Sequence, residues 1–129
     1  MPRRIIQETD ISDRKIVLWG PRDEDVWKTY CSCPKKISRD AENQTSAICK
    51  VFLETGRIPR KIVRVSGYLY KIKPWGYRIF GYFENSETIF VVVHCTEKKS
   101  QKNTNKIDDV IESAHKRMEL AKKDRRYIE

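Results

Sequence analysis

The stretch Tyr68-Leu-Tyr-Lys-Ile-Lys-Pro-Trp-Gly-Tyr-Arg-Ile-Phe-Gly-Tyr-Phe83 does most to decide how this chain is expected to fold. Its two halves are rich in apolar and aromatic residues, and the Pro-Trp-Gly between them is typical of a turn, so it predicts a β-hairpin. Because alternate side chains of a strand face opposite ways, Lys71 and Lys73 share one side of the first strand, and Arg78 lies on the returning strand. Cations and aromatic rings on adjacent strands predict a surface for a phosphodiester backbone and unstacked bases.

The rest of the chain is predicted to form strands and helices around this hairpin. Strands are predicted at 15–19, at 61–65, which leads across Ser66-Gly67 into the hairpin, and at 88–94. Apolar residues at helical spacing predict helices over about 35–55 and from about 105, with a short helix through 23–30.

The order of these elements is strand, helices, three consecutive strands and helix. It predicts an α+β fold with a small, mostly antiparallel sheet, made of an N-terminal strand and a three-strand meander, with helices packed on one face and the other face open. The 129 residues suffice for one domain spanning 1–129, with flexible ends at 1–14 and 122–129. No apolar run approaches the roughly 18–20 residues that span a bilayer, and the N-terminus lacks a secretory leader, so we expect a cytoplasmic protein with no membrane contact.

The positive charge of the chain is concentrated in one region. The formal net charge is +9, and residues 56–106 contain 11 Lys and Arg against 3 Asp and Glu, which gives that region a net +8. An excess of this kind in one part of a fold favours a localised site for a polyanion.

Four cysteines, Cys31, Cys33, Cys49 and Cys95, do not have the spacing of a structural zinc site, which usually has two close pairs. Cys49 on a helix and Cys95 on a strand are expected to pack as small apolar residues. We therefore expect no metal and no cofactor.

Three fragments occur in order before the terminal helix, namely Tyr-Lys-Ile-Lys at 70–73, Gly-Tyr-Arg-Ile at 76–79 and Lys-Lys-Ser-Gln-Lys at 98–102. With the element order, they resemble the RelE/HigB family of bacterial toxins, in particular its phage-derived branch. The resemblance covers Gly56 to Met118, and the N-terminal half only in element order. It implies a RelE-like fold and a toxin-type endoribonuclease, an mRNA interferase of type II toxin–antitoxin systems. Such an enzyme cleaves mRNA, usually on the ribosome, is held inactive by a cognate antitoxin protein, and meets operator DNA only through that antitoxin.

The resemblance also implies roles for individual residues. Lys71 and Lys73 match the lysines that contact and deprotonate the substrate, and Arg78 matches the arginine that stabilises the phosphate. Lys98 or Lys99 matches the basic position after the last strand, and the fragments leave open which. Some members of the family have a tyrosine in that segment, and residues 98–106 contain none.

The remaining candidates come from their positions in the sequence. His94, at the end of the last predicted strand, is the candidate acid for the leaving oxygen. Phe80 and Tyr82 have the same strand parity as Arg78 and are predicted to stack on bases, whereas Tyr77, Ile79 and Phe83 are predicted to face the core. The nucleic-acid-binding candidates are Lys102, Phe80, Tyr82 and Arg64.

These residue types suit cleavage of RNA by attack of the 2′-hydroxyl on the neighbouring phosphorus, without a metal. An arginine disperses charge on the phosphate oxygens, and a lysine acts as base if nearby cations lower its pKa. Two alternatives remain. The chain is a catalytically silent nucleic-acid-binding module of the same fold, such as a prophage remnant, or it acts on a protein, as relatives that poison DNA gyrase do.

Overall fold

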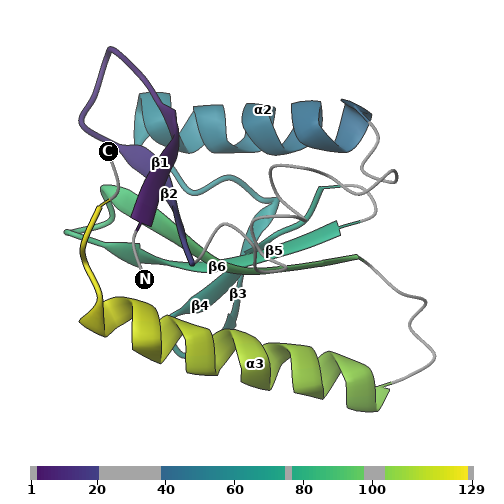
Figure 1. Cartoon of the computed structure of the whole chain (residues 1–129). Helices are drawn as coiled ribbons and strands as arrows, with labels where there is room; N and C mark the ends of the chain where they lie inside the picture. Colours follow the sequence, from purple (N-terminus) through teal and green to yellow (C-terminus); the bar gives the residue numbers. More distant parts are fainter. Residues whose placement is uncertain (1–2, 21–38, 75–76, 98–103, 128–129) are drawn as a thin grey trace.

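The computed structural model of the chain describes residues 3–20, 39–74, 77–97 and 104–127. A six-stranded sheet in the order β1-β2-β6-β5-β4-β3 lies between two helices, α2 (Arg39–Thr55) and α3 (Thr104–Lys123), as Figure 1 shows. β2 and β6 run parallel, and the other neighbouring pairs are antiparallel. The predicted α+β class with a mostly antiparallel sheet is confirmed. The strands are β1 (Arg3–Glu8), β2 (Lys15–Trp19), β3 (Ile62–Ser66), β4 (Leu69–Ile72), β5 (Tyr77–Glu84) and β6 (Ile89–Glu97). The short helix predicted at 23–30 and the first turn predicted for α2 lie outside the described residues.

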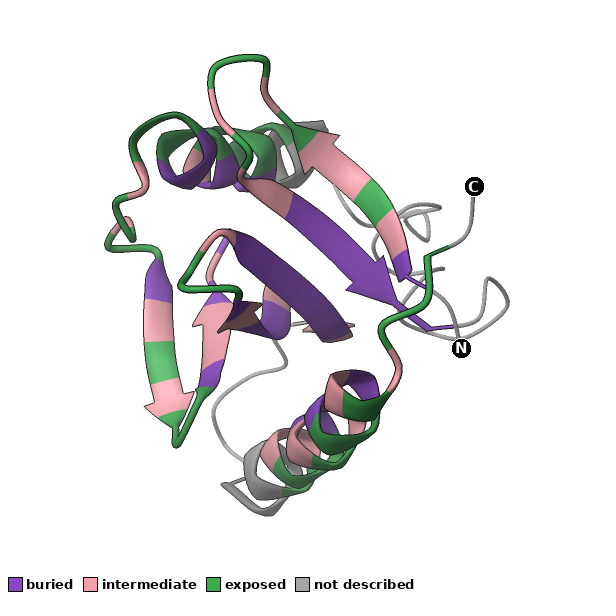
Figure 2. Ribbon diagram, turned by 90° about the vertical axis from the view of Figure 1, so that its left-hand side faces the viewer, coloured by how far each residue is buried: buried purple, intermediate pink, exposed green. Residues whose placement is uncertain are grey.

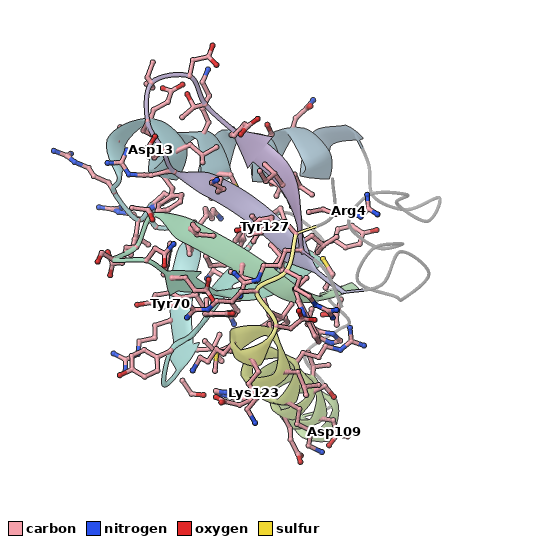
Figure 3. All side chains as sticks on the ribbon, turned by 60° about the vertical axis from the view of Figure 1, so that its left-hand side comes forward. Arg4, Asp13, Tyr70, Asp109, Lys123 and Tyr127 are labelled. Carbon is pink, nitrogen blue, oxygen red and sulfur yellow. The ribbon has the colours of Figure 1, made fainter. Side chains whose placement is uncertain are left out.

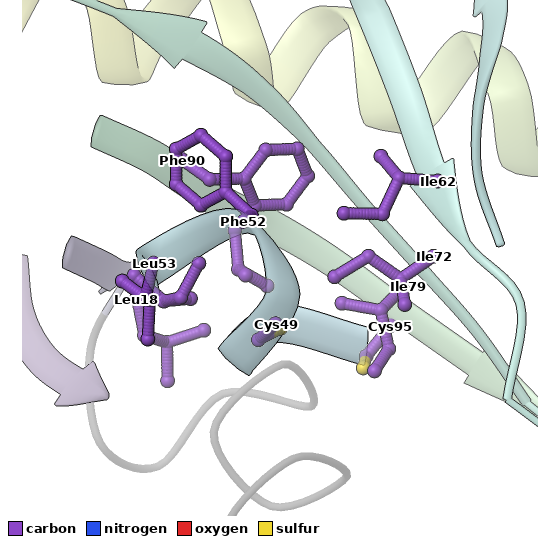
Figure 4. Packing of buried hydrophobic residues seen from close by; sticks show 11 residues of the cluster. Leu18, Cys49, Phe52, Leu53, Ile62, Ile72, Ile79, Phe90 and Cys95 are labelled. Carbon is purple, nitrogen blue, oxygen red and sulfur yellow. The ribbon is translucent and has the colours of Figure 1, made fainter. Parts of the chain in front are cut away.

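Each face of the sheet has an apolar cluster that packs against one helix. Along β2, Ile16 and Leu18 pack in the core cluster that contains Phe52 of α2, which Figure 4 shows from close by. Val17 and Trp19 of the same strand pack in the other cluster, with Ala114, Met118 and Ala121 of α3. The expectation that the helices cover one face is therefore wrong, because a strand whose consecutive residues are all apolar must be shielded from water on both sides. Figure 2 shows buried strands between helices whose outer faces are exposed.

The C-terminal part of the sheet is a meander of four strands rather than three. β3 and β4 are separate antiparallel strands, with Ser66 paired to Leu69 across a two-residue turn. Gly67 in this turn has a φ of 55°, a left-handed conformation that glycine adopts without steric cost. The segment predicted as one interrupted strand from 61 to 73 therefore reverses direction at Gly67.

The N-terminal strand β1 forms an edge of the sheet where the sequence predicted a flexible end. Arg3 is 1% exposed, and its guanidinium donates to both oxygens of Glu84, at 2.6 and 2.7 Å, and to the main-chain oxygen of Ala121 at 2.9 Å. The Arg3 amide donates to the oxygen of Arg126 at 2.7 Å. Arg3 and Tyr127 also form an isolated parallel bridge, so the end of the chain lies beside the β1–β2 hairpin (Figure 3). Arg3 thus joins β1, β5 and the C-terminal end of α3, where a positive charge is favourable.

Two predictions about single residues can also be compared with the structure. Cys49 and Cys95 are buried in the cluster beneath α2, as expected, whereas Cys31 and Cys33 lie outside the described residues. In the described part of the chain, neither helix is both long enough and apolar enough to cross a bilayer.

Candidate nucleic-acid interface

Lys71, Lys73 and Arg78, here called the basic cluster, lie on the α3 face of the sheet where β4 ends and β5 begins. Lys71 is paired with Phe80 across β4 and β5, and Phe80 belongs to the core beneath α3. Paired residues of neighbouring strands point to the same face, so the side chain of Lys71 points that way too. Lys73 lies two residues beyond Lys71, and Arg78 two residues before Phe80, so both share this direction. The structure thus brings these three predicted cations together.

Along β4 and β5, the residues on this face change from buried core side chains to the partly exposed side chains of the site. On β4, Leu69 is fully buried and Lys71 is half-buried. On β5, Tyr82 and Phe80 are buried, whereas Arg78 is half-buried. Leu69, Phe80 and Tyr82 pack in one cluster with Val110, Ile111, Ala114, Met118 and Ala121 of α3. The basic cluster lies beyond these strand residues on β4 and β5, where its side chains are partly exposed.

The surroundings of the basic cluster lower the pKa of two of its members, Lys71 and Arg78. Burial lowers the pKa of Lys71, and the neighbouring charges of Arg78 and Lys73 lower it further. Burial also lowers the pKa of Arg78, although an arginine remains protonated under all ordinary conditions. Among the side chains that the structure describes, which do not include Glu97 or residues 104–108, no carboxylate forms an ion pair with the cluster. None of these side chains therefore neutralises the positive charge of the cluster.

Main-chain carbonyls hold the guanidinium of Arg78 in place. Its Nη1 donates to the oxygen of Tyr77 at 2.6 Å and to that of Pro74 at 3.3 Å. These bonds use one nitrogen of a group that has five N–H donors, so further donors are available for a phosphate. A guanidinium oriented in this way can bind two phosphate oxygens at once.

His94 lies on the same face as the basic cluster but not beside Lys71. Phe80 is opposite Lys71 on one side and opposite His94 on the other, so two strand spacings, about 10 Å, separate the two residues. The rings of His94 and Phe80 pack with their centroids 6.0 Å apart. Since Arg78 is paired with Thr96, His94 is the diagonal neighbour of Arg78, about 7–8 Å away along the sheet. His94 is thus closer to the arginine than to the lysine.

The stacking role predicted for Phe80 and Tyr82 is wrong. Phe80 is 4% exposed and Tyr82 is 1% exposed, and both belong to the core beneath α3. The Tyr82 hydroxyl donates to Glu84 at 2.7 Å and accepts a bond from Arg3 at 3.2 Å, so its polar end is also used inside the protein. Their parity with Arg78 was predicted correctly, but α3 covers the part of the face where they lie. Tyr77 and Ile79 are buried as predicted, and Phe83 packs against the α2 core.

Arg64 is separated from the basic cluster. It is paired with Tyr70, whose ring packs against the core on the α2 side of the sheet, so Arg64 points away from the α3 face. Its Nε donates to the oxygen of Gly67 at 2.7 Å, which ties the exposed side chain to the β3–β4 turn. The structure therefore does not bring Arg64 together with the basic cluster. Lys98, Lys99 and Lys102 lie outside the described residues.

Two neighbours of the basic cluster were not among the predicted site residues. Thr96 is half-buried and lies opposite Arg78 on β6. The oxygen of Lys61 accepts a hydrogen bond from the amide of Lys73 at 2.8 Å, which brings the exposed Lys61 to the cluster. The sequence does not identify Thr96 and Lys61 as neighbours of the cluster, because this depends on how the strands are paired. A bulge between Phe80 and Gly81 shifts the β5–β6 pairing by one residue, so pairs counted from the β5–β6 turn would be wrong beyond it.

Comparison with models of known protein families found no match to this chain. A search of curated proteins also found no match. The arguments about function therefore rest on the residues of this chain and on their arrangement.

Proposed function

We propose that this chain is an endoribonuclease of the RelE/HigB toxin type, which cleaves mRNA by metal-independent attack of the 2′-hydroxyl. The observation that carries the proposal is the placement of Lys71, Lys73 and Arg78 on one partly accessible patch, where burial and neighbouring cations lower the pKa of Lys71. A lysine with a lowered pKa next to an oriented arginine provides a base beside a group that binds phosphate. The three fragments of sequence that resemble the family include all three residues.

The proposed reaction divides between these side chains. Neutral Lys71 takes the proton of the 2′-hydroxyl, and the 2′-oxygen then attacks the adjacent phosphorus. Arg78 and Lys73 stabilise the negative charge that develops on the phosphoryl oxygens. The bond from phosphorus to the 5′-oxygen breaks and leaves a 2′,3′-cyclic phosphate and a 5′-hydroxyl. The 5′-oxygen takes a proton from an acid, for which His94, the diagonal neighbour of Arg78, is the candidate among the described residues.

The proposal includes the setting that the family resemblance implies. The chain acts in the cytoplasm on mRNA held by the ribosome, and a cognate antitoxin protein blocks it. The basic cluster supports this part, because no carboxylate among the side chains that the structure describes neutralises it, and its positive charge attracts an acidic segment of an inhibitor as well as a phosphate.

Replacement of Arg78 tests the proposal, with Arg64 as the matched control. The two arginines lie on adjacent parts of the same sheet but on opposite faces. We expect Arg78→Ala to lower the rate of mRNA cleavage on translating ribosomes by about 10²–10³-fold, as loss of one donor to the transition state typically does. Arg64→Ala should cleave like the parent. The products are assayed for a 2′,3′-cyclic phosphate.

The two variants separate the proposed function from its rivals. Equal cleavage by Arg78→Ala and the parent would show that the basic cluster is not the site. Binding of RNA by the parent without any cyclic phosphate product would favour the catalytically silent module. Loss of cleavage in Arg64→Ala to the same extent as in Arg78→Ala would place the chemistry elsewhere on the sheet.

A further inference from the structure

A serine and a histidine form a hydrogen-bonded pair beside the β3–β4 turn, apart from the basic cluster. The Oγ of Ser66, which is exposed at the end of β3, lies 2.5 Å from the Nε2 of His115 on α3. A Cβ added at Gly67 would lie 4.0 Å from the Cε1 of His115, so the imidazole ring stands next to the turn. The proposed cleavage of RNA uses neither Ser66 nor His115.

Regular elements of the fold carry both members of this pair. Ser66 is paired with Leu69, which is fully buried in the cluster beneath α3, so Ser66 also faces α3. His115 directly follows Ala114, which is buried in the same cluster. The packing of these two neighbours therefore holds the hydroxyl against the imidazole. A serine within hydrogen-bond reach of a histidine, with both on rigid elements, is the arrangement that serine-based acyl transfer requires.

The turn also supplies hydrogen-bond donors next to the serine. Gly67 and Tyr68, which directly follow Ser66, are both exposed, and among the described residues neither amide has an acceptor. Gly67 has no side chain that would cover these amides. Main-chain N–H groups close to a nucleophile can stabilise the oxyanion of a tetrahedral intermediate. A nucleophile, a base and candidate oxyanion donors are therefore neighbours on one exposed surface.

We propose that Ser66 and His115 form a catalytic dyad that hydrolyses small carboxylic esters. In the tautomer of His115 with a free Nε2, Ser66 donates its proton to that nitrogen as its Oγ attacks the carbonyl carbon of the ester. The amides of Gly67 and Tyr68 stabilise the oxyanion. The bond from carbon to the alcohol oxygen then breaks, and this oxygen takes the proton from His115. Water, with His115 again as base, hydrolyses the acyl-serine, which releases the carboxylic acid and restores Ser66.

A fluorescent fluorophosphonate tests this dyad, because an activated serine displaces its fluoride and keeps the phosphonyl group. The rate of labelling is measured on gels, and the labelled residue is identified by peptide mass spectrometry, for the parent, Ser66→Ala, His115→Gln and a control, Ser86→Ala. Ser86 is an exposed serine in the β5–β6 turn. Glutamine can still hydrogen-bond Ser66 but accepts no proton, so His115→Gln separates a base from a structural partner. Circular dichroism checks that each variant is folded.

The parent and Ser86→Ala should be labelled at Ser66, and Ser66→Ala should not be labelled. His115→Gln should react about 10²–10⁴-fold more slowly, which is the usual effect of losing a general base. With p-nitrophenyl acetate, the parent should release p-nitrophenol and carry an acetyl group on Ser66.

Three results would overturn the inference, namely no labelling of the parent, equal rates for the parent and His115→Gln, and labelling of a residue other than Ser66. The test is independent of the proposed function, because Ser66 is not part of the basic cluster. Ser66→Ala should therefore cleave mRNA like the parent, and failure of the parent to cleave RNA would leave the labelling results to stand.

Discussion

Replacement of Arg3 by methionine should be one of the most damaging single substitutions in this protein. The side chain of Arg3 is 1% exposed and that of Glu84 is 7% exposed, and the two form a bidentate pair. Methionine fills much of the volume of arginine but leaves the Glu84 carboxylate buried, with the Tyr82 hydroxyl at 2.7 Å and the Arg125 Nε at 4.0 Å as its remaining partners. Removal of one partner from a buried ion pair typically costs about 3–5 kcal/mol. The same substitution also removes the bonds to the main-chain oxygens of Ala121 and Asp124.

The loss of stability should depend on pH in a direction that follows from Glu84. Burial alone raises the pKa of this carboxyl, but hydrogen bonds from Arg3 and Tyr82 outweigh it and hold the pKa below its ordinary value. In the parent, this contribution to stability is present above the pKa of the unfolded chain, about 4.3, and is lost as the pH falls through the lower folded pKa. Without Arg3, burial dominates and raises the folded pKa above 4.3. The variant therefore gains stability relative to the parent as the pH falls from 7 towards 5.

Urea denaturation followed by tryptophan fluorescence at pH 7 and pH 5 measures both effects. Arg126→Met is the matched control, since Arg126 is exposed and pairs with Asp124 at the surface, and we expect it to leave stability nearly unchanged. Arg3→Met/Glu84→Gln should lose less stability than Arg3→Met alone, because the uncompensated charge is gone. This reasoning would be refuted if Arg3→Met lowered the free energy of unfolding by less than about 1 kcal/mol at pH 7. It would also be refuted if the difference in free energy of unfolding between the variant and the parent were larger at pH 5 than at pH 7.

Three further predictions concern the core and the site. Phe80→Ala should lower the free energy of unfolding by about 3–5 kcal/mol, because Phe80 is only 4% exposed. Tyr68→Ala is the control and should lower it little, because Tyr68 is 74% exposed. Similar urea midpoints for the two variants would mean that Phe80 is not part of the core. The pKa of Lys71 is lowered by burial and then by the charges of Arg78 and Lys73, so Lys73→Gln should raise it. The pH at which the cleavage rate rises should therefore move upward. An unchanged pH dependence of the cleavage rate would mean that Lys71 is not the base. Burial raises the pKa of the Cys49 thiol to about 12, so iodoacetamide at pH 8 should label it only after unfolding, as peptide mass spectrometry can measure; labelling in the native protein would indicate that α2 opens.

The elements that the sequence predicted are those whose signals are local. Residues 15–19 form a strand with the predicted bounds, and the long helix ends at Thr55, before Gly56 with its φ of 73°. Strand β1 has no such signal, because it begins with two arginines and alternates poorly. It pairs with β2 along its length, and Arg3 also bonds Glu84, which lies 81 residues away in the sequence. A contact of this kind becomes visible only when both ends of the chain are placed on the same sheet.

The sequence predicted only part of the site. The alternation of side chains along a strand shows which residues share a face, but it does not show which part of that face a helix covers. On β5, Arg78, Phe80 and Tyr82 do share one face, but the first is half-buried whereas the other two are in the core. The same change occurs on β4, where Leu69 is fully buried and Lys71 is half-buried. Residue type records where the buried part of this face ends, since an uncompensated lysine or arginine is too costly to bury in an apolar core. Parity therefore gives the face, and the position at which cations replace apolar residues along two neighbouring strands gives the boundary between core and site.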